Sequence, residues 1–98
     1  MRKQNTATTS DLQDRSVCVG VITSVHGVKG YVKIRSFTDS PVDVISFKNV
    51  FDEAGNNYKI RLVFPKKDYF IASIDGINNR NQAELLRNTK LFIKRSEL

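Results

Sequence analysis

The stretch HGVKG, residues 26–30, combines a histidine and a lysine with two glycines, a combination that suits a catalytic turn or a phosphate-binding loop. A lipase-type hydrolase would also need a G-x-S-x-G nucleophile elbow, which the chain lacks. The spacing of Gly27 and Gly30 fits neither a Walker-type loop nor a dinucleotide fingerprint. The acids are scattered, so we expect no pair that acts as general acid and base. The sequence therefore predicts a protein that is not an enzyme and has no small-molecule substrate.

The sequence also gives no basis for a metal site or another cofactor. A single cysteine, Cys18, cannot form an internal disulfide, and one cysteine with one histidine cannot build an ordinary zinc site. Cys18 lies in the apolar run of residues 17–24, where we expect a small buried side chain rather than a reactive thiol. We expect no cofactor and no metal.

The clearest candidate for binding is a basic and aromatic face that begins at HGVKG. Residues 31–36, YVKIRS, alternate between apolar and polar side chains, as on a strand with one buried face. Cations beside an aromatic ring suit an RNA backbone, with the ring available for stacking. The alternative is a solvated outer face with no partner. The residues of this face are Tyr31, Lys33 and Arg35, with Lys29 on the adjoining loop.

The residues around this face are expected to shape it. Gly27 and Gly30 lie where the chain reverses, and a positive φ is often required there. Gly20, in the middle of an apolar run, predicts a bulge or a sharp bend. His26 has two interpretations: a binding residue at the mouth of the turn, or a packed or hydrogen-bonding residue that fixes the loop.

Six short strand patterns separated by turn signals predict an all-β fold. Strands joined by short turns pair antiparallel, and so many short strands would expose costly edges unless the sheet closes. We therefore expect a compact six-stranded antiparallel β-barrel with one or two short helices. The expected strands are residues 17–24, 31–36, 47–51, 58–64, 69–74 and 90–95.

Two short helices are expected outside the strands. Pro41 marks the start of a one-turn helix. Asn81 and Glu84 have the spacing of a capping box, and Ala83 with Leu86 would form the buried side of a two-turn helix.

The strand at residues 58–64 is expected to divide its side chains between two faces. The apolar ones, Tyr58, Ile60, Leu62 and Phe64, would share one face. The cations Lys59 and Arg61 would take the other, and with Lys66 and Lys67 they either extend the basic surface or lie elsewhere. The sequence leaves both options open.

Length and charge suggest one small basic domain. Residues 1–16 are polar and unpatterned, so we expect a flexible tail, followed by a barrel domain at residues 17–98. Sixteen cations against ten acids give a net charge of +6, which suggests an anionic partner such as nucleic acid. There is no apolar run long enough to span a bilayer and no signal peptide, so we expect a cytoplasmic protein. Nothing in the sequence suggests an oligomer, so we also expect a monomer.

Two segments of the chain carry recognisable motifs. The first is VGVITSVHGVKGYVKIRSFTD, residues 19–39, and the second is residues 74–95, with its Gly-Ile, Ala-Glu-x-Leu and closing strand. Together these segments resemble a known family, the ribosome maturation factors of the RimM type, which are 16S rRNA-processing proteins. In the first segment the matching residues are Gly20, His26, Gly27, Gly30, Val32, Lys33, Thr38 and Asp39. In the second, Asn79-Arg80 replaces an acid–arginine pair, and Asn88 stands where a glycine is common.

This resemblance covers roughly residues 17–95 and implies the family's N-terminal domain, a six-stranded barrel like those of translation factors. The family normally adds a C-terminal PRC-type barrel, which we expect to be absent here. The resemblance also implies binding to the free small ribosomal subunit near its head. The implied partners are 16S rRNA and a head ribosomal protein, the nineteenth of the small-subunit series. An alternative is a protein-interaction module that contacts a ribosomal protein or the C-terminal domain and does not bind RNA directly.

Overall fold

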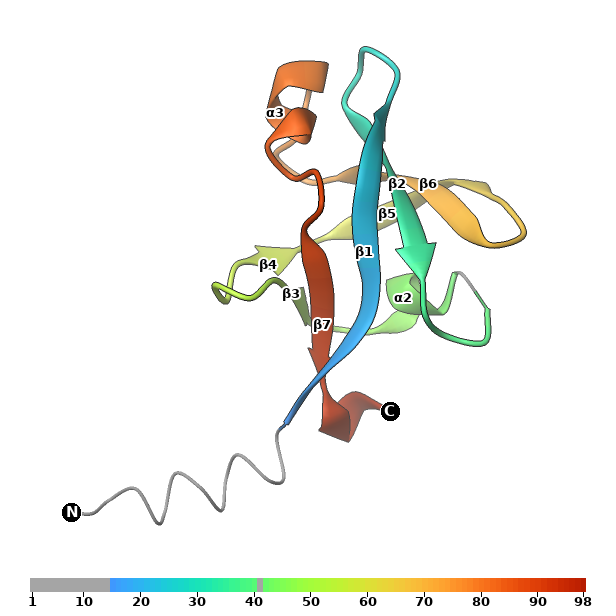
Figure 1. Cartoon of the computed structure of the whole chain (residues 1–98), viewed down its shortest axis with the longest axis vertical. Helices are drawn as coiled ribbons and strands as arrows, with labels where there is room; N and C mark the ends of the chain where they lie inside the picture. Colours follow the sequence, from blue (N-terminus) through green and yellow to red (C-terminus); the bar gives the residue numbers. More distant parts are fainter. Residues whose placement is uncertain (1–14, 41) are drawn as a thin grey trace, which may run out of the picture.

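A single antiparallel sheet that curls on itself forms the body of the protein (Figure 1). The computed structural model describes residues 15–40 and 42–98, and in these residues the sheet has seven strands in the order β4-β3-β7-β1-β2-β6-β5. The strands are β1 (Ser16–His26), β2 (Tyr31–Ser36), β3 (Val50–Phe51), β4 (Asn57–Tyr58), β5 (Ile60–Pro65), β6 (Tyr69–Ile74) and β7 (Lys90–Lys94). The same residues form the short helices α2 (Asp43–Ser46) and α3 (Arg80–Glu84) and a 3-10 helix η1 (Arg95–Glu97). The predicted all-β antiparallel fold is confirmed.

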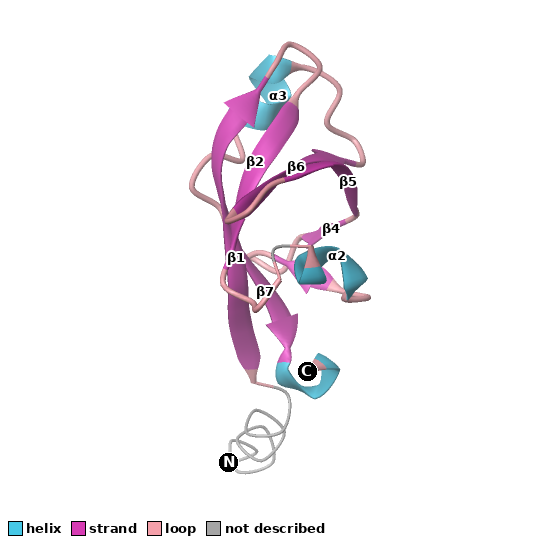
Figure 2. Cartoon of the chain, turned by 90° about the vertical axis from the view of Figure 1, so that its right-hand side faces the viewer, coloured by secondary structure: helices cyan, strands magenta, loops and turns pink. Residues whose placement is uncertain are grey.

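The strand count is seven rather than the predicted six because one extended segment bends in its middle. β4 and β5 lie at the two edges of the sheet, yet only Lys59 separates them in the sequence. The Lys59 carbonyl accepts a hydrogen bond of 3.0 Å from the Asp75 amide at the bend. The two edges are thus joined by one residue, and the sheet closes nearly into a barrel around its interior (Figure 2). Closure limits the unpaired edge that a sheet of short strands would otherwise expose.

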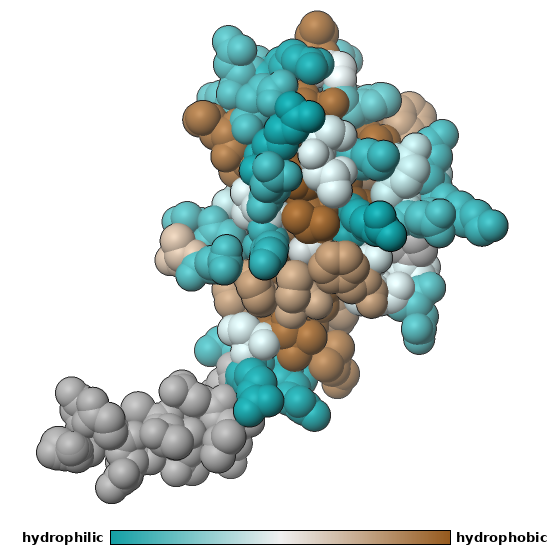
Figure 3. Space-filling view, in the orientation of Figure 1, coloured by the Kyte–Doolittle hydropathy of each residue, from teal (hydrophilic) through white to brown (hydrophobic). Residues whose placement is uncertain are grey.

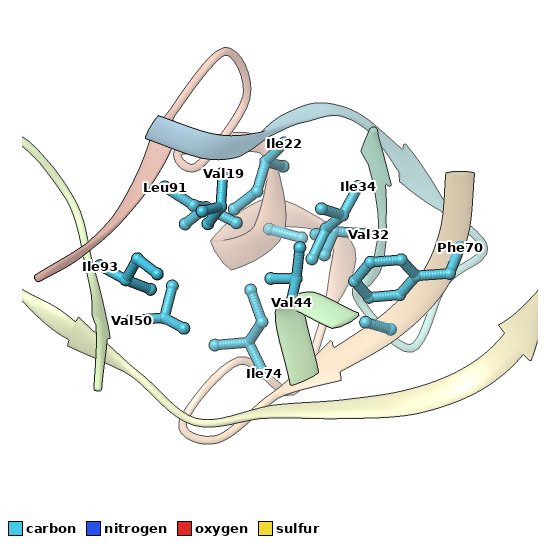
Figure 4. Close-up of a cluster of buried hydrophobic side chains, with 12 residues drawn as sticks. Val19, Ile22, Val32, Ile34, Val44, Val50, Phe70, Ile74, Leu91 and Ile93 are labelled. Atoms are coloured by element: carbon cyan, nitrogen blue, oxygen red, sulfur yellow. The ribbon is translucent and has the colours of Figure 1, made fainter. Parts of the chain in front are cut away.

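The core fills the inside of this curled sheet. Figure 4 shows side chains from β1, β2, β6 and β7 pointing toward one another, with Val44 of α2 among them. The alternation predicted for β2 is confirmed, since Val32 and Ile34 are 0% exposed. Burying each such aliphatic side chain contributes about 1.5–3 kcal/mol of transfer free energy. Cys18, which was expected to be buried, is only half-buried, and its thiol lies 3.5 Å from the Gly20 carbonyl.

The long strand β1 carries two irregularities that let it pair with both β2 and β7. Its register against β7 shifts between Cys18 and Gly20, and its register against β2 shifts between Ile22 and Ser24. A Cβ built at Gly20 would lie 2.8 Å from the Arg35 carbonyl oxygen, so only glycine allows this approach of the two strands. The predicted bulge at Gly20 is confirmed.

The turn between β1 and β2 packs against the start of α3. Gly27 and Gly30 have φ angles of +79° and +86°, as the sequence predicts. Gly30 is buried, and a Cβ built on it would lie 2.5 Å from the Asn79 carbonyl oxygen. The Arg80 amide donates a hydrogen bond of 3.1 Å to the Val28 carbonyl. These contacts fix the HGVKG turn to the helix.

The helix α3 begins two residues earlier than its sequence suggests. Its N-cap is Asn79, whose side-chain oxygen accepts a 2.9 Å hydrogen bond from the Gln82 amide. The predicted capping box of Asn81 and Glu84 is therefore wrong. Ala83 is fully buried as predicted. Asn88, after the helix, has a φ of +68°, a left-handed conformation that asparagine tolerates better than most residues with a Cβ.

Several predicted boundaries fall at the limits of the described residues. Pro41 and residues 1–14 lie outside them, so neither the expected helix start at Pro41 nor most of the expected tail can be compared. β1 begins at Ser16, one residue before the expected start of the barrel domain. β3 is shorter than the expected strand at residues 47–51. None of the helices in the described ranges is long and apolar enough to cross a membrane.

Candidate nucleic-acid interface

The outer surface of β1, β2 and β6 collects most of the residues that the sequence singled out. Because residues directly opposite each other in an antiparallel pair lie on the same face, the register identifies their neighbours. His26 of β1 lies opposite Tyr31 of β2. Along its other edge β2 pairs with β6, where Lys33 lies opposite Ile71 and Arg35 lies opposite Tyr69. One exposed face therefore carries two cations, a histidine and two tyrosines.

A groove of about 430 Å³ lies on this face and runs from β1 across to β5. We call it the outer groove. Ile71, at 3% exposed, is buried on this side of the sheet, outside the cluster that forms the core. Phe64 of β5, opposite Ile71, is 52% exposed. The groove therefore combines apolar surface with positive charge. Its main lining residues are His26, Lys33, Phe64, Lys66, Tyr69 and Ile71.

Lys33 is held in place by two contacts. Its ammonium lies over the Tyr69 ring, 4.2 Å from the ring centre, an attraction between a cation and an aromatic face. Its backbone carbonyl accepts a hydrogen bond of 3.3 Å from the Thr23 hydroxyl. Lys33 also borders a second hollow of about 290 Å³, which it shares with Arg35 and Asp68. The two cations thus lie beside adjoining hollows on one surface.

The cations of this face carry no ion pair within the described residues. The ion pairs that form there join Arg61 to Asp75 at 3.3 Å, and Glu84 to Arg80 at 3.6 Å and to Arg87 at 3.4 Å. None of them involves Lys29, Lys33, Arg35 or Lys66. Within residues 15–40 and 42–98, none of these four charges forms an ion pair with a carboxylate, which leaves them available to an anionic partner. Of the cations left open by the sequence, Lys66 joins the groove, whereas Arg61 is paired elsewhere.

The predicted site residues are not equally close to the groove. His26 is exposed and lines it, and no hydrogen bond among the described residues involves its imidazole. Tyr31 is half-buried beside His26. Lys29 is exposed on the glycine turn and does not line the groove. The position of His26 is that of a surface residue rather than one packed into the loop.

Phe64, Tyr69 and Ile71 were not among the site residues predicted from the sequence. Phe64 was expected to share a face with Ile60, and this is wrong. The register of β5 against β6 shifts between Leu62 and Phe64, so that Phe64 faces outward opposite Ile71. A bulge of this kind has no clear sequence signal when no glycine marks it. Tyr69 could have been found by extending the outward face of β2 to its neighbouring strand.

The described residues contain no cluster of three or more side chains suited to a metal ion. Acids are scarce around the groove. Among the described residues that line the groove and the adjoining hollow, a single one is acidic, Asp68 of the adjoining hollow. The arrangement offers positive charge, an exposed aromatic ring and an apolar floor, which are features that suit binding.

Comparisons with known proteins agree on one family. Residues 17–98 match the family model described as the RimM N-terminal domain. The chain is 47% identical over 88 residues to the ribosome maturation factor RimM of Wolbachia pipientis wMel, covering 89% of this chain and 52% of that protein. It is 43% identical over 83 residues to the ribosome maturation factor RimM of Paramagnetospirillum magneticum, covering 84% of this chain and 47% of that protein. The chain thus spans about half the length of the curated relatives it matches.

Solved structures show the same likeness. One is a putative 16S ribosomal RNA processing protein RimM from Pseudomonas aeruginosa, with a TM-score of 0.70 and 28% identity, over 85% of this chain and 52% of that one. Another is the N-terminal domain of RimM from Thermus thermophilus, with a TM-score of 0.66 and 21% identity, over 86% of this chain and 94% of that one. The second likeness is evidence for the fold alone.

Proposed function

The chain belongs to the RimM family of ribosome maturation factors, and on this premise we propose that it binds the free small ribosomal subunit near its head and assists the processing of 16S rRNA. The domain would act by binding and not by covalent chemistry. A factor that binds one conformation of the rRNA more tightly than another shifts the population toward it, without any reaction of its own. Such work would place the protein in the cytoplasm as a monomer.

The observation that carries this proposal is the set of cations on one face that form no ion pair with a carboxylate of the described part of the chain. Lys33 and Arg35 project from the same side of β2, and Lys66 lines the groove next to them. Each cation that meets a phosphate releases a counterion, so the affinity gained this way depends strongly on salt. Because an aromatic ring and an apolar floor lie between these charges, the surface suits RNA better than a simple polyanion.

The contacts implied for the family would be divided between two parts of a longer protein. Residues 17–98 would form the N-terminal barrel and contact 16S rRNA. A PRC-type barrel in the other half of the relatives would contribute the contact with the head ribosomal protein. Binding of this domain alone would then be weaker than that of a protein with both barrels.

The test is the salt dependence of binding to free small subunits. The variant replaces Lys29, Lys33 and Arg35 with glutamine, leaving thirteen cations against ten acids, a net charge of +3. If three phosphate contacts are lost, the slope of log K against log salt should flatten by about 2, taking roughly 0.7 for each contact with single-stranded RNA. A matched control replaces three exposed lysines outside the two hollows, Lys48, Lys59 and Lys94, with the same change in net charge.

The control separates a local surface from overall charge. We expect the control variant to keep most of the slope, because its lysines lie away from the outer groove. Equal slopes for the wild-type domain and the variant at Lys29, Lys33 and Arg35 would show that these residues do not contact RNA. Equal flattening in both variants would show that only net charge matters.

A second candidate function is binding to another protein. It is favoured by a separate surface that is apolar where the outer groove is basic. In Figure 3, apolar side chains gather over the lower parts of β1 and β7. Phe51 and Phe92 stack there with ring centres 6.3 Å apart. Phe37, 57% exposed, and the exposed Leu98 line a nearby hollow of about 310 Å³. A protein partner on this surface would bind with little salt dependence, because a desolvated apolar interface loses little from screening.

A further inference from the structure

The outer groove contains an aromatic ring that the fold does not use. Phe64 is 52% exposed, although a phenylalanine gains most from burial. The aromatic pair that stacks within the described residues is Phe51 with Phe92, on another surface. Tyr69, the other ring in the groove, already has the Lys33 ammonium over one face. Phe64 is therefore the ring whose surface is open to a partner.

We propose that the outer groove holds an unpaired nucleotide of RNA, with the base stacked on Phe64 and the phosphates next to Lys33 and Lys66. This inference rests on the proposed function and adds a specificity to it: the domain prefers single-stranded segments of rRNA to helices. Ile71 would form the floor under the base, and His26 would stand at the wall on the β1 side. The volume of about 430 Å³ lies within the roughly 300–1,000 Å³ typical of sites for small ligands.

The charge of the groove restricts its occupant. Lys33, Lys66 and His26 line it, and none of the groove residues that the structure describes is acidic. An anionic partner is therefore favoured over a basic protein surface. The partner must also cover Phe64 and Ile71, which calls for a flat apolar group next to the negative charge. A nucleotide supplies both within one residue, since the base and its phosphate are joined through the sugar.

The position of the ring favours unpaired over paired RNA. In an A-form helix the bases are stacked inside and only the backbone and groove edges face a protein. A duplex can therefore satisfy Lys33 and Lys66 but cannot place a base against Phe64. A single strand can do both. Stacking on an aromatic ring is worth about 1–3 kcal/mol per base, or roughly five- to 150-fold in affinity.

The experiment measures the affinity of the 98-residue chain for a short fluorescein-labelled oligoadenylate, alone and annealed to oligouridylate. We expect the single strand to bind more tightly than the duplex. Phe64→Leu keeps an apolar side chain but removes the ring, and it should weaken single-strand binding by roughly five- to 150-fold while leaving duplex binding unchanged. The matched control is Phe37→Leu, because Phe37 is similarly exposed but lines a different hollow. It should change neither affinity.

A second variant reports on the stack directly. The chain has no tryptophan, so Phe64→Trp introduces a single fluorescent indole at the groove. A base stacked on it should quench its emission when the single strand is added, and the duplex should not. Lys66→Gln should weaken the binding of both RNA forms, because its proposed partner is a phosphate that both forms contain.

The outcomes distinguish this inference from the function on which it rests. Equal affinity for the single strand and the duplex, or an equal effect of Phe64→Leu on both, would overturn the nucleotide site. Salt-dependent binding of small subunits would still support the proposed function in that case. If Phe64→Leu weakened binding to small subunits but not to either oligonucleotide, the occupant would be a protein segment and the inference would be wrong. A wild-type chain that bound neither RNA nor subunits would contradict both proposals.

Discussion

The two glycines of the HGVKG turn make a matched pair for testing how the turn is held. Both have a positive φ, +79° at Gly27 and +86° at Gly30. A Cβ at Gly27 would meet no atom within 4 Å, whereas a Cβ at Gly30 would lie 2.5 Å from the Asn79 carbonyl oxygen. Gly27→Ala therefore tests the backbone conformation alone. Gly30→Ala tests the same conformation together with the close approach of the turn to α3.

The two substitutions should lower the free energy of unfolding by different amounts, because only the Cβ at Gly30 would contact Asn79. An alanine in the left-handed region costs about 1–2 kcal/mol, and the reduced freedom of the unfolded chain offsets about 0.4–1 kcal/mol of that. We therefore expect Gly27→Ala to lower the free energy of unfolding by about 1 kcal/mol. At Gly30 the clash is with backbone atoms of Asn79, which cannot move aside as a side chain can. Overpacking of this kind adds about 1–3 kcal/mol, for a total of about 3 kcal/mol.

The assay is urea denaturation followed by circular dichroism, because the chain has no tryptophan to report unfolding. At about 4–8 °C for each kcal/mol in a domain of this size, the two variants should also separate clearly in thermal unfolding. Equal destabilisation by Gly27→Ala and Gly30→Ala would refute the reasoning. It would mean that the turn is not held tightly against Asn79.

Two further predictions concern the turn between β3 and β4, where Asp52 lies, and the helix α3. The Asp52 carboxylate accepts a 2.6 Å hydrogen bond from the Tyr58 hydroxyl, which lowers the pKa of Asp52 from 3.8 to about 2. Because this pKa is lower in the folded state, the stability it contributes is complete above pH 3.8 and is lost as the pH falls toward 2. When the free energy of unfolding is measured as the pH is lowered over this range, it should decline less in Asp52→Asn than in the wild-type chain. An equal decline in both would contradict this role of Asp52. Asn79→Ala should cost about 1 kcal/mol in urea denaturation by removing the N-cap, and a cost near zero would show that Gln82 does not need it.

Much of the fold could be predicted because its local patterns are not ambiguous. The alternation of β2 identified Val32 and Ile34 as core residues, and the positions of Gly20, Gly27 and Gly30 identified the bulge and the turn. Each of these follows from a constraint that acts within a few residues. The helix start was missed because three asparagines within residues 78–81 offer the same capping chemistry, and the contact of Asn79 with the turn decides between them.

The candidate site was only half predictable, because the groove is made by four strands. His26 and Lys33 were found from their own segment, but Phe64 and Tyr69 join them only because β6 pairs with β2 and β5 pairs with β6. The bulge before Phe64 reverses the face on which its side chain lies. The bend at Lys59 similarly divides one predicted strand between two edges of the sheet. Such irregularities depend on long-range pairing, which a pattern along one segment does not contain.

The most direct measurement of the central claim is a chemical-shift map of the isotopically labelled domain titrated with rRNA of the small-subunit head. The account predicts that backbone amides of β1, β2 and β6 around the outer groove shift most, with His26, Lys33 and Tyr69 among them, and that these shifts diminish as salt is added. Shifts confined to the apolar surface around Phe51 and Phe92, or shifts that do not depend on salt, would contradict it.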